Sequence, residues 1–117
     1  MVVDQVDGPQ TDRVFHALAD ATRRDIVRRV MRADLSVSAL ARGYPMSFAA
    51  VQKHVAALER AGLVTKQRRG REQLVRGNPD TIRRAQRLLG DLEALWRGRL
   101  DRFGEILADD TSEGAAS

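Results

Sequence analysis

The sequence contains no cysteine, and only 4% of its 117 residues are aromatic. Without cysteine the chain can form no disulfide and no thiolate metal site, and it has no thiol nucleophile; this composition fits a reducing compartment. No apolar run approaches the roughly 18 to 20 residues of a membrane span, and residues 1–12 are acidic rather than apolar. We therefore expect an untargeted, cytoplasmic protein.

The motifs of common enzyme classes are missing as well. There is no glycine-rich phosphate loop, no H-E-x-x-H zinc motif, and no serine followed or preceded by histidine and aspartate in a triad order. The two histidines, His16 and His54, are far apart in the sequence. Carboxylates near the end of the chain alternate with arginines, and i,i+4 ion pairs explain them. We expect no enzyme activity, no cofactor and no bound metal.

Acidic residues gather at the two ends of the chain, which leaves the middle strongly basic. Residues 13–108 contain 10 acidic residues and all 20 basic residues, of which 18 are arginine. The arginine guanidinium group forms bidentate hydrogen bonds with phosphates and with guanine edges. A basic folded part of this kind indicates a polyanionic partner such as nucleic acid.

The length allows one domain, which we place at residues 11–108, between a disordered tail at 1–10 and a disordered acidic tail at 109–117. Apolar residues spaced three to four apart, with capping residues and glycines at the ends, predict four short helices. Their expected starts are Thr11, the Asp20 to Thr22 region, Ser36 or Ser38, and Ser47. A β-branched segment that begins at Leu63-Val64-Thr65, the tip Arg69-Gly70-Arg71 and a return strand at Gln73-Leu74-Val75 then predict a basic hairpin.

Residues 79–108 predict a long last helix. Their apolar residues recur about every 3.6 positions, the helical period, and a second stripe widens the apolar surface. A helix of this length exceeds the width of a compact domain of this size, so a second chain is expected to cover part of it. We expect a homodimer through the last and first helices, with the interface residues Val14, Phe15, Leu88, Leu92, Leu95, Trp96 and Phe103.

Two short helices joined by a tight turn and followed at once by an arginine-rich hairpin are typical of a winged helix-turn-helix. From Phe15 to Leu107 the sequence resembles the ArsR/SmtB superfamily of bacterial transcriptional repressors, and its metal-independent, autorepressor-like subgroup in particular. The resemblance implies a mainly α fold with a small β-hairpin wing (α+β), about five helices, and a dimer through the first and last helices. It is carried by the ordered elements Met46-Ser47, Val51-x-Lys53-His54, Leu58-Glu59-x-Ala61-Gly62-Leu63-Val64 and Arg69-Gly70-Arg71.

The resemblance also implies that the helix at 47–61 lies in the DNA major groove and that the hairpin at 63–76 contacts the backbone or minor groove. Gln pairs with adenine, Lys donates to guanine or phosphate, and wing cations bind phosphate. For several positions a structural role stays open: Ser47 as a cap, Phe48 packed on Tyr44, His54 as a packing residue, and the charged positions as solvated surface. The expected DNA-binding residues are Ser38, Ser47, Phe48, Ala49, Gln52, Lys53, His54, Lys66, Arg68, Arg69 and Arg71.

These features predict a sequence-specific, homodimeric repressor that binds double-stranded DNA at an inverted-repeat operator, with its own promoter as one candidate. Two alternatives stay open. One is a winged-helix module whose basic face binds an acidic protein. The other is a repressor released by a small-molecule inducer that binds near the dimer helices around Trp96. The sequence specifies neither the operator nor an inducer.

Overall fold

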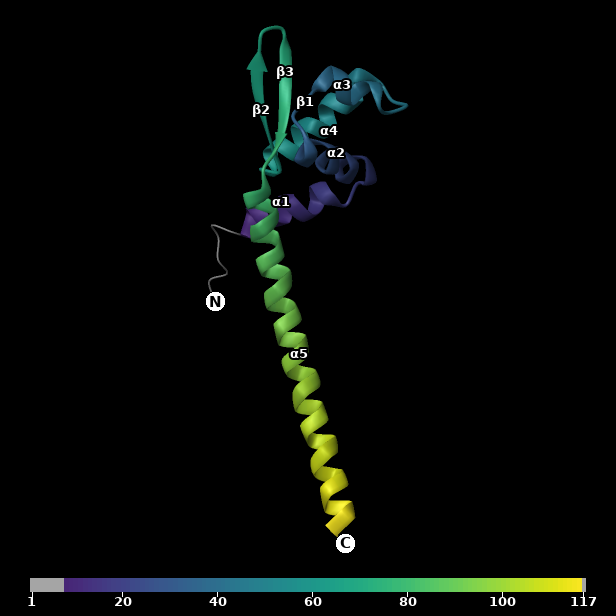
Figure 1. The fold of residues 1–117 in the computed structure, drawn as a ribbon, viewed down its shortest axis with the longest axis vertical. Helices are drawn as coiled ribbons and strands as arrows, with labels where there is room; N and C mark the ends of the chain where they lie inside the picture. Colours follow the sequence, from purple (N-terminus) through teal and green to yellow (C-terminus); the bar gives the residue numbers. More distant parts are fainter. Residues whose placement is uncertain (1–7, 117) are drawn as a thin grey trace. The chain divides into compact units, whose positions relative to one another are not determined.

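The computed structural model describes residues 8–116, with side chains described as far as Asp109; the expected tail at residues 1–7 lies outside this range. The chain divides into two units, residues 1–85 and residues 86–117. The described elements, drawn in Figure 1, are α1 (Gly8–Leu18), α2 (Ala21–Arg32), β1 (Leu35–Ser36), α3 (Val37–Arg42), α4 (Phe48–Arg60), β2 (Val64–Arg69), β3 (Glu72–Gly77) and α5 (Pro79–Ala116). The expected mainly α fold with a small hairpin wing is confirmed.

Two helix boundaries differ from the sequence prediction. Helix α1 begins at Gly8, three residues before the predicted start at Thr11, because Pro9 is compatible with the first turn of a helix. Helix α5 continues to Ala116, beyond the predicted end at Ala108. The segment after Ala108 contains no proline that would stop a helix. Residues 8–10 and 109–116 are therefore helical where tails were expected.

Polar caps begin three of the helices. The side-chain oxygens of Asp20, Ser36 and Ser47 each accept a 3.0 Å hydrogen bond from the backbone N–H three residues further on. Each bond satisfies a donor that the helix itself leaves free, which fixes where the helix starts. Of the alternatives that the sequence left open, Asp20 caps α2 rather than Thr22, and Ser36 caps α3 rather than Ser38.

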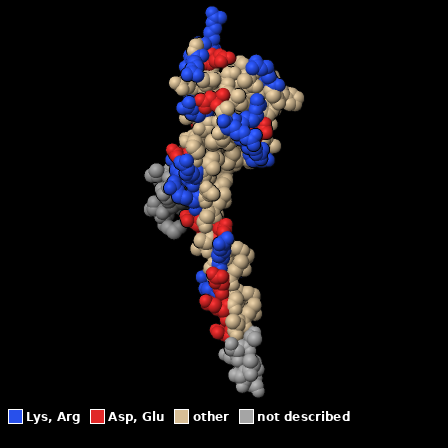
Figure 2. Space-filling view, in the orientation of Figure 1, with Lys and Arg blue, Asp and Glu red and all other residues tan. Residues whose placement is uncertain are grey.

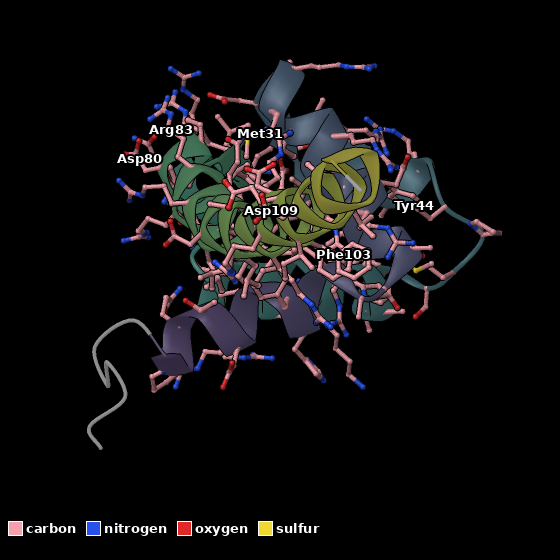
Figure 3. The ribbon with its side chains drawn as sticks, turned by 90° about the horizontal axis from the view of Figure 1, so that it is seen from below. Met31, Tyr44, Asp80, Arg83, Phe103 and Asp109 are labelled. Carbon is pink, nitrogen blue, oxygen red and sulfur yellow. The ribbon has the colours of Figure 1, made fainter. Side chains whose placement is uncertain are left out.

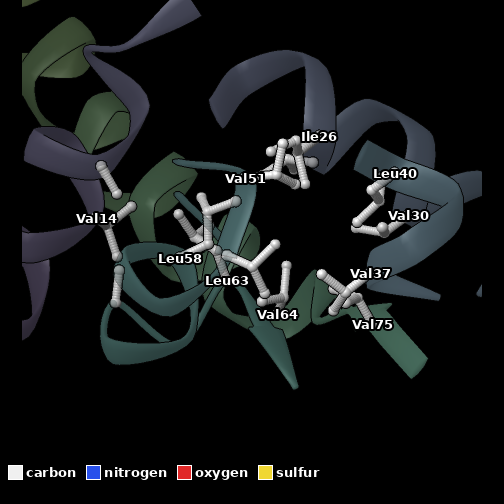
Figure 4. Packing of buried hydrophobic residues seen from close by; sticks show 14 of the residues in the cluster. Val14, Ile26, Val30, Val37, Leu40, Val51, Leu58, Leu63, Val64 and Val75 are labelled. Carbon is white, nitrogen blue, oxygen red and sulfur yellow. The ribbon is translucent and has the colours of Figure 1, made fainter. Parts of the chain in front are cut away.

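The hydrophobic core of the first unit joins α2, α3 and α4 to the sheet. Figure 4 shows Ile26 beside Val51, and Leu58 close to Leu63 and Val64. Each of these five side chains is at most 1% exposed. Full burial of one aliphatic side chain of this size stabilises a fold by about 1.5–3 kcal/mol. Helix α4 and the start of the wing are thus fixed against α2.

The wing consists of the antiparallel pair β2 and β3, and β1 pairs with the other edge of β3. Gly70 has a φ of 62° and follows Arg69, which is paired with Glu72. A two-residue loop whose first residue is a glycine with positive φ is typical of a type II′ hairpin turn. At the base of the sheet, Arg76 of β3 forms a 2.8 Å ion pair with Asp34, which precedes β1.

A small hydrogen-bond network connects the end of α4 to the start of α5. The Gly62 carbonyl accepts bonds from Asn78 Nδ2 at 3.0 Å and from Thr81 Oγ1 at 2.7 Å. The Asn78 N–H also donates to the Leu63 carbonyl at 2.9 Å. Thr81 is only 1% exposed, so its hydroxyl depends on these protein partners. In the same first turn of α5, the exposed side chains of Asp80 and Arg83 form an ion pair and lie side by side in Figure 3.

The second unit consists of α5 from Gln86 onward. Its charged side chains lie along one side of the helix in Figure 2, and uncharged side chains lie along the other. Large apolar side chains here are exposed, from 38% for Leu88 to 71% for Leu95. Phe103, labelled in Figure 3, is 59% exposed. In the part of the chain that the structure describes, no helix is both long and apolar enough to cross a membrane.

Candidate nucleic-acid interface

The first half of α4 turns a small, polar and basic face to solvent. Its opposite face, made by Val51, Val55 and Leu58, is buried in the core. This orientation follows from the apolar spacing of three to four residues, which places those side chains on one side of the helix. The exposed residues include five of the predicted DNA-binding residues, namely Ser47, Phe48, Ala49, Gln52 and Lys53.

Helix α4 is the second helix of a helix-turn-helix, and the preceding turn is anchored on α2. The Tyr44 hydroxyl in this turn donates a 2.6 Å hydrogen bond to Asp25 Oδ2. The Arg29 guanidinium lies 5.3 Å from the centre of the Tyr44 ring, within cation–π range. Burial, together with the bond to Asp25, raises the pKa of Tyr44 above its ordinary value of 10.0. Ser38, on α3 before this turn, is exposed as a contact residue requires.

His54 has a different environment from the other predicted contact residues of α4. Its side chain is 20% exposed, and its Nδ1 accepts a 3.1 Å hydrogen bond from Arg23 Nε on α2. The Asp20 carboxylate lies 3.9 Å from the same nitrogen. The structure therefore places His54 at the contact between α4 and α2. Its partner Arg23 could not be found from the sequence, because 31 residues separate the two.

The Asp20 carboxylate belongs to the same contact. It accepts the Arg23 backbone N–H, and this bond, with the nearby His54 and Arg23 side chains, lowers the pKa of Asp20 below its ordinary value of 3.8. The cap of α2 and the orienting contact of α4 therefore share one residue. A change at Asp20 is expected to affect both helices.

The cations of the wing differ in whether they form an ion pair within the described protein. Lys66 Nζ lies 3.4 Å from Glu59 Oε1, so this predicted contact residue is paired with the end of α4. Arg68, Arg69 and Arg71 are exposed, and none of them has an ion-pair partner among residues 8–109. Arg68 Nε donates only to the Gly70 carbonyl, at 3.3 Å. The hairpin tip thus presents three positive charges that form no ion pair within residues 8–109.

The predicted dimer residues also divide into two groups. Val14 is 3% exposed and belongs to the core of its own unit, so it is not available to a partner and the expectation for it is corrected. Phe15 is 36% exposed at the surface of α1. The α5 members are all exposed, and their position at a dimer interface stays a prediction: Leu88, Leu92, Leu95, Trp96 and Phe103. Among the described residues, no group of three or more His, Cys, Asp or Glu is placed to hold a metal ion.

Comparison with known proteins identifies relatives over most of the chain. Residues 18–67 match the family model of a helix-turn-helix domain. The HTH-type transcriptional regulator Rv2034 of Mycobacterium tuberculosis is 35% identical over 103 residues, which cover 86% of this chain and 94% of the relative. The family match at residues 18–67 includes α2, α3 and α4, and therefore the complete helix-turn-helix.

Solved structures agree in fold. The ArsR-like transcriptional regulator from Rhodococcus sp. RHA1 has a TM-score of 0.75 and 37% identity, covering 84% of this chain and 92% of that one. The homodimeric winged helix-turn-helix DNA-binding domain Mb0332 from Mycobacterium bovis has a TM-score of 0.63 and 25% identity, covering 80% of this chain and 89% of that one. These relatives are transcriptional regulators rather than enzymes.

Proposed function

Because the chain belongs to the ArsR family of winged helix-turn-helix transcriptional regulators, we propose that it acts as a homodimeric repressor that binds an inverted-repeat operator. In this proposal α4 enters the major groove and the wing contacts the phosphate backbone or the minor groove. The two copies of α4 would then read major-groove segments about 34–36 Å apart, one helical turn of DNA. Repression follows because the bound dimer occludes polymerase.

The main support for DNA binding comes from two neighbouring features of the first unit. The exposed polar face of α4 is followed in the chain by a hairpin tip whose arginines have no ion-pair partner among the described residues. Base readout needs side chains such as Gln52 and Lys53, which can form hydrogen bonds with base edges. Phosphate contact needs cations that are free to replace counterions. Both kinds of group are present in consecutive elements of the first unit.

The homodimer part of the proposal rests on α5. Its exposed side chains from Leu88 to Leu107 form a long apolar stripe. Contiguous exposed apolar surface on a small protein marks an interaction site, because its contact with water is unfavourable. The same mode of assembly is supported by the homodimeric relative from Mycobacterium bovis. We expect Leu95→Glu to shift the protein toward a monomer in sedimentation velocity, whereas Arg99→Glu, beside it on the helix, should shift it less.

The DNA experiment measures binding to the region upstream of the protein's own gene and to unrelated DNA at several salt concentrations. A repressor of its own promoter should prefer the upstream region by a thousandfold or more, as specific regulators do, whose preference is roughly 10³–10⁷. Equal, weak and salt-sensitive binding to both DNAs would contradict that operator. A lack of salt-dependent binding to any DNA would favour the alternative of an acidic protein partner.

Two substitutions separate the wing from the recognition helix. Arg69→Ala with Arg71→Ala should weaken binding to both DNAs. The salt slope, which is the steepness with which the logarithm of the binding constant falls with the logarithm of the salt concentration, should decrease by about 0.9 for each phosphate that the wing no longer neutralises. Arg28→Ala with Arg32→Ala removes the same charge from exposed positions of α2 and serves as the matched control. Gln52→Ala should reduce the preference for the operator while the salt slope stays the same. Equal slopes for the two arginine pairs would refute the wing assignment.

A further inference from the structure

A hollow of about 610 Å³ opens on the surface of the first unit between α1, α2 and the last turn of α4. Ala17, Ala57 and Ala61 supply its apolar lining. Ala17 and Ala61 are also among the buried residues of the core, at 2% and 1% exposure. Alanines at these positions leave the space that larger side chains would fill. The volume lies within the range of roughly 300–1,000 Å³ that small-molecule sites occupy.

The polar lining of the hollow is mostly cationic. Arg13, Arg23 and Arg60 border it together with His16, and Asp12 is the one carboxylate among the lining residues. No ion pair joins Asp12 to these arginines in the described part of the chain. Arg23 donates its Nε to His54 at 3.1 Å, and its terminal nitrogens form no ion pair within residues 8–109. Three guanidinium groups thus border the hollow, and the opposing charges are the Asp12 carboxylate in its lining and the Asp20 carboxylate near Arg23.

This combination matches an amphipathic anion. Guanidinium groups bind carboxylates through two parallel charge-assisted hydrogen bonds. An apolar body gains from contact with the partly exposed Ala57 and with the aliphatic stems of the lining arginines, above the buried Ala17 and Ala61. The hollow lies at the end of α4 opposite to Ser47, about 20 Å along the helix at 1.5 Å per residue. It is therefore separate from the residues that are expected to contact bases. We propose that this hollow is a binding site for a small organic carboxylate with a ring or alkyl body.

The experiment uses the full chain without DNA, so its outcome does not depend on the proposed function. Methyl and amide NMR signals are followed during titration with 2-naphthoate, with its neutral counterpart 2-naphthamide, and with inorganic phosphate. We expect saturable shifts for Ala17, Ala57 and Ala61 with 2-naphthoate. 2-Naphthamide should bind about tenfold more weakly, because it lacks the charge, and phosphate should also bind about tenfold more weakly, because it lacks the apolar body.

Variants test which residues bind the carboxylate. Arg13→Gln with Arg60→Gln should weaken 2-naphthoate binding about tenfold, since neither side chain can then form a charge-assisted hydrogen bond with the carboxylate. Arg28→Gln with Arg32→Gln, which removes two exposed charges of α2 outside the hollow, should leave it unchanged. Circular dichroism and the unfolding midpoint of each variant establish that it is folded.

Several results would overturn the proposal. One is equal binding of 2-naphthoate and 2-naphthamide, and another is equal binding of phosphate. Shifts confined to the wing or to Phe48 would place the anion on the nucleic-acid face instead. Binding that disappears as the protein concentration rises would mean that a second copy of the chain covers the hollow.

Discussion

Replacing Gly62 with alanine should destabilise the protein more than replacing Gly70, although both glycines have a positive φ, 78° and 62° respectively. A positive φ strains a residue other than glycine, at a cost of about 1–3 kcal/mol. Around Gly70 no atom lies within 4 Å of an added Cβ, so Gly70→Ala should cost only this backbone strain. The tip of the wing therefore provides a matched control.

Gly62 has an additional cost because its surroundings are crowded. A Cβ atom there would lie 2.9 Å from Gln10 Nε2 and 3.3 Å from Thr81 Oγ1. Gln10 donates to the Ala61 carbonyl, and moving it away breaks that bond. A bond of this kind contributes about 0.5–1.5 kcal/mol to stability. We therefore expect Gly62→Ala to cost about 0.5–1.5 kcal/mol more than Gly70→Ala.

Urea denaturation followed by circular dichroism measures both free energies of unfolding. All proteins are compared at one concentration, because association changes the apparent stability. In a Gln10→Ala background the nearer of the two crowding atoms is absent and only Thr81 Oγ1 remains, at 3.3 Å, so Gly62→Ala should then cost about as much as Gly70→Ala. Equal costs of the two glycine substitutions in the wild-type background would refute the reasoning. An extra cost at Gly62 that remains without Gln10 would also refute it.

Three further predictions concern the contacts of α2, α4 and α5. Asp20→Ala should destabilise the protein by about 0.5–2 kcal/mol through loss of the α2 cap. Because the pKa of Asp20 is lower in the folded state than its ordinary 3.8, this carboxylate stabilises the fold above that value; unfolding measured against pH should show the stabilisation disappearing as pH falls through 3.8 and below. His54→Ala should weaken binding to all DNA sequences without changing the salt slope, because the substitution releases α4 from Arg23 and leaves every phosphate contact in place; a reduced slope would identify His54 as a phosphate ligand instead. Thr81→Val should cost about 1–3 kcal/mol in urea denaturation, because it removes a buried 2.7 Å bond to the Gly62 carbonyl; a cost near zero would mean that Asn78 alone satisfies this carbonyl.

The sequence predicted the helix-turn-helix and the wing because short-range rules decide them. Ser47 follows a tight turn and precedes an apolar stripe, so a helix start at this position requires no knowledge of the rest of the fold. The hairpin was similarly predictable, since Gly70 between two predicted strands favours a tight turn. These local signals agree with the tertiary packing, which buries Val51, Val55 and Leu58 on one side of α4.

Contacts between distant residues could not be predicted in the same way. The apolar spacing of α1 placed Val14 on an apolar face, and this spacing is the same for a core residue and for an interface residue. Only the packed structure shows that Val14 lies in the core at 3% exposure while Phe15 remains at the surface. Lys66 looked like one of four wing cations, yet a residue seven positions earlier, Glu59, pairs with it. Charge counting along a chain does not reveal such pairs, because their formation depends on three-dimensional proximity.

The orientation of α4 depends on groups outside its exposed face. His54 is bound by Arg23 of α2, Glu59 is paired with Lys66 of β2, and the Ala61 carbonyl accepts a bond from Gln10 of α1. Three different elements therefore fix the helix, and none of these contacts involves Gln52 or Lys53, the side chains proposed to contact base edges. Base contacts determine sequence preference, and phosphate contacts determine the salt dependence of binding. The contacts of α4 with α1, α2 and β2 instead determine whether the base-contacting and the phosphate-contacting side chains are presented to DNA together. Measuring the sequence preference, the salt slope and the overall affinity for DNA on the same variants therefore distinguishes residues that contact DNA from residues that hold α4 in place.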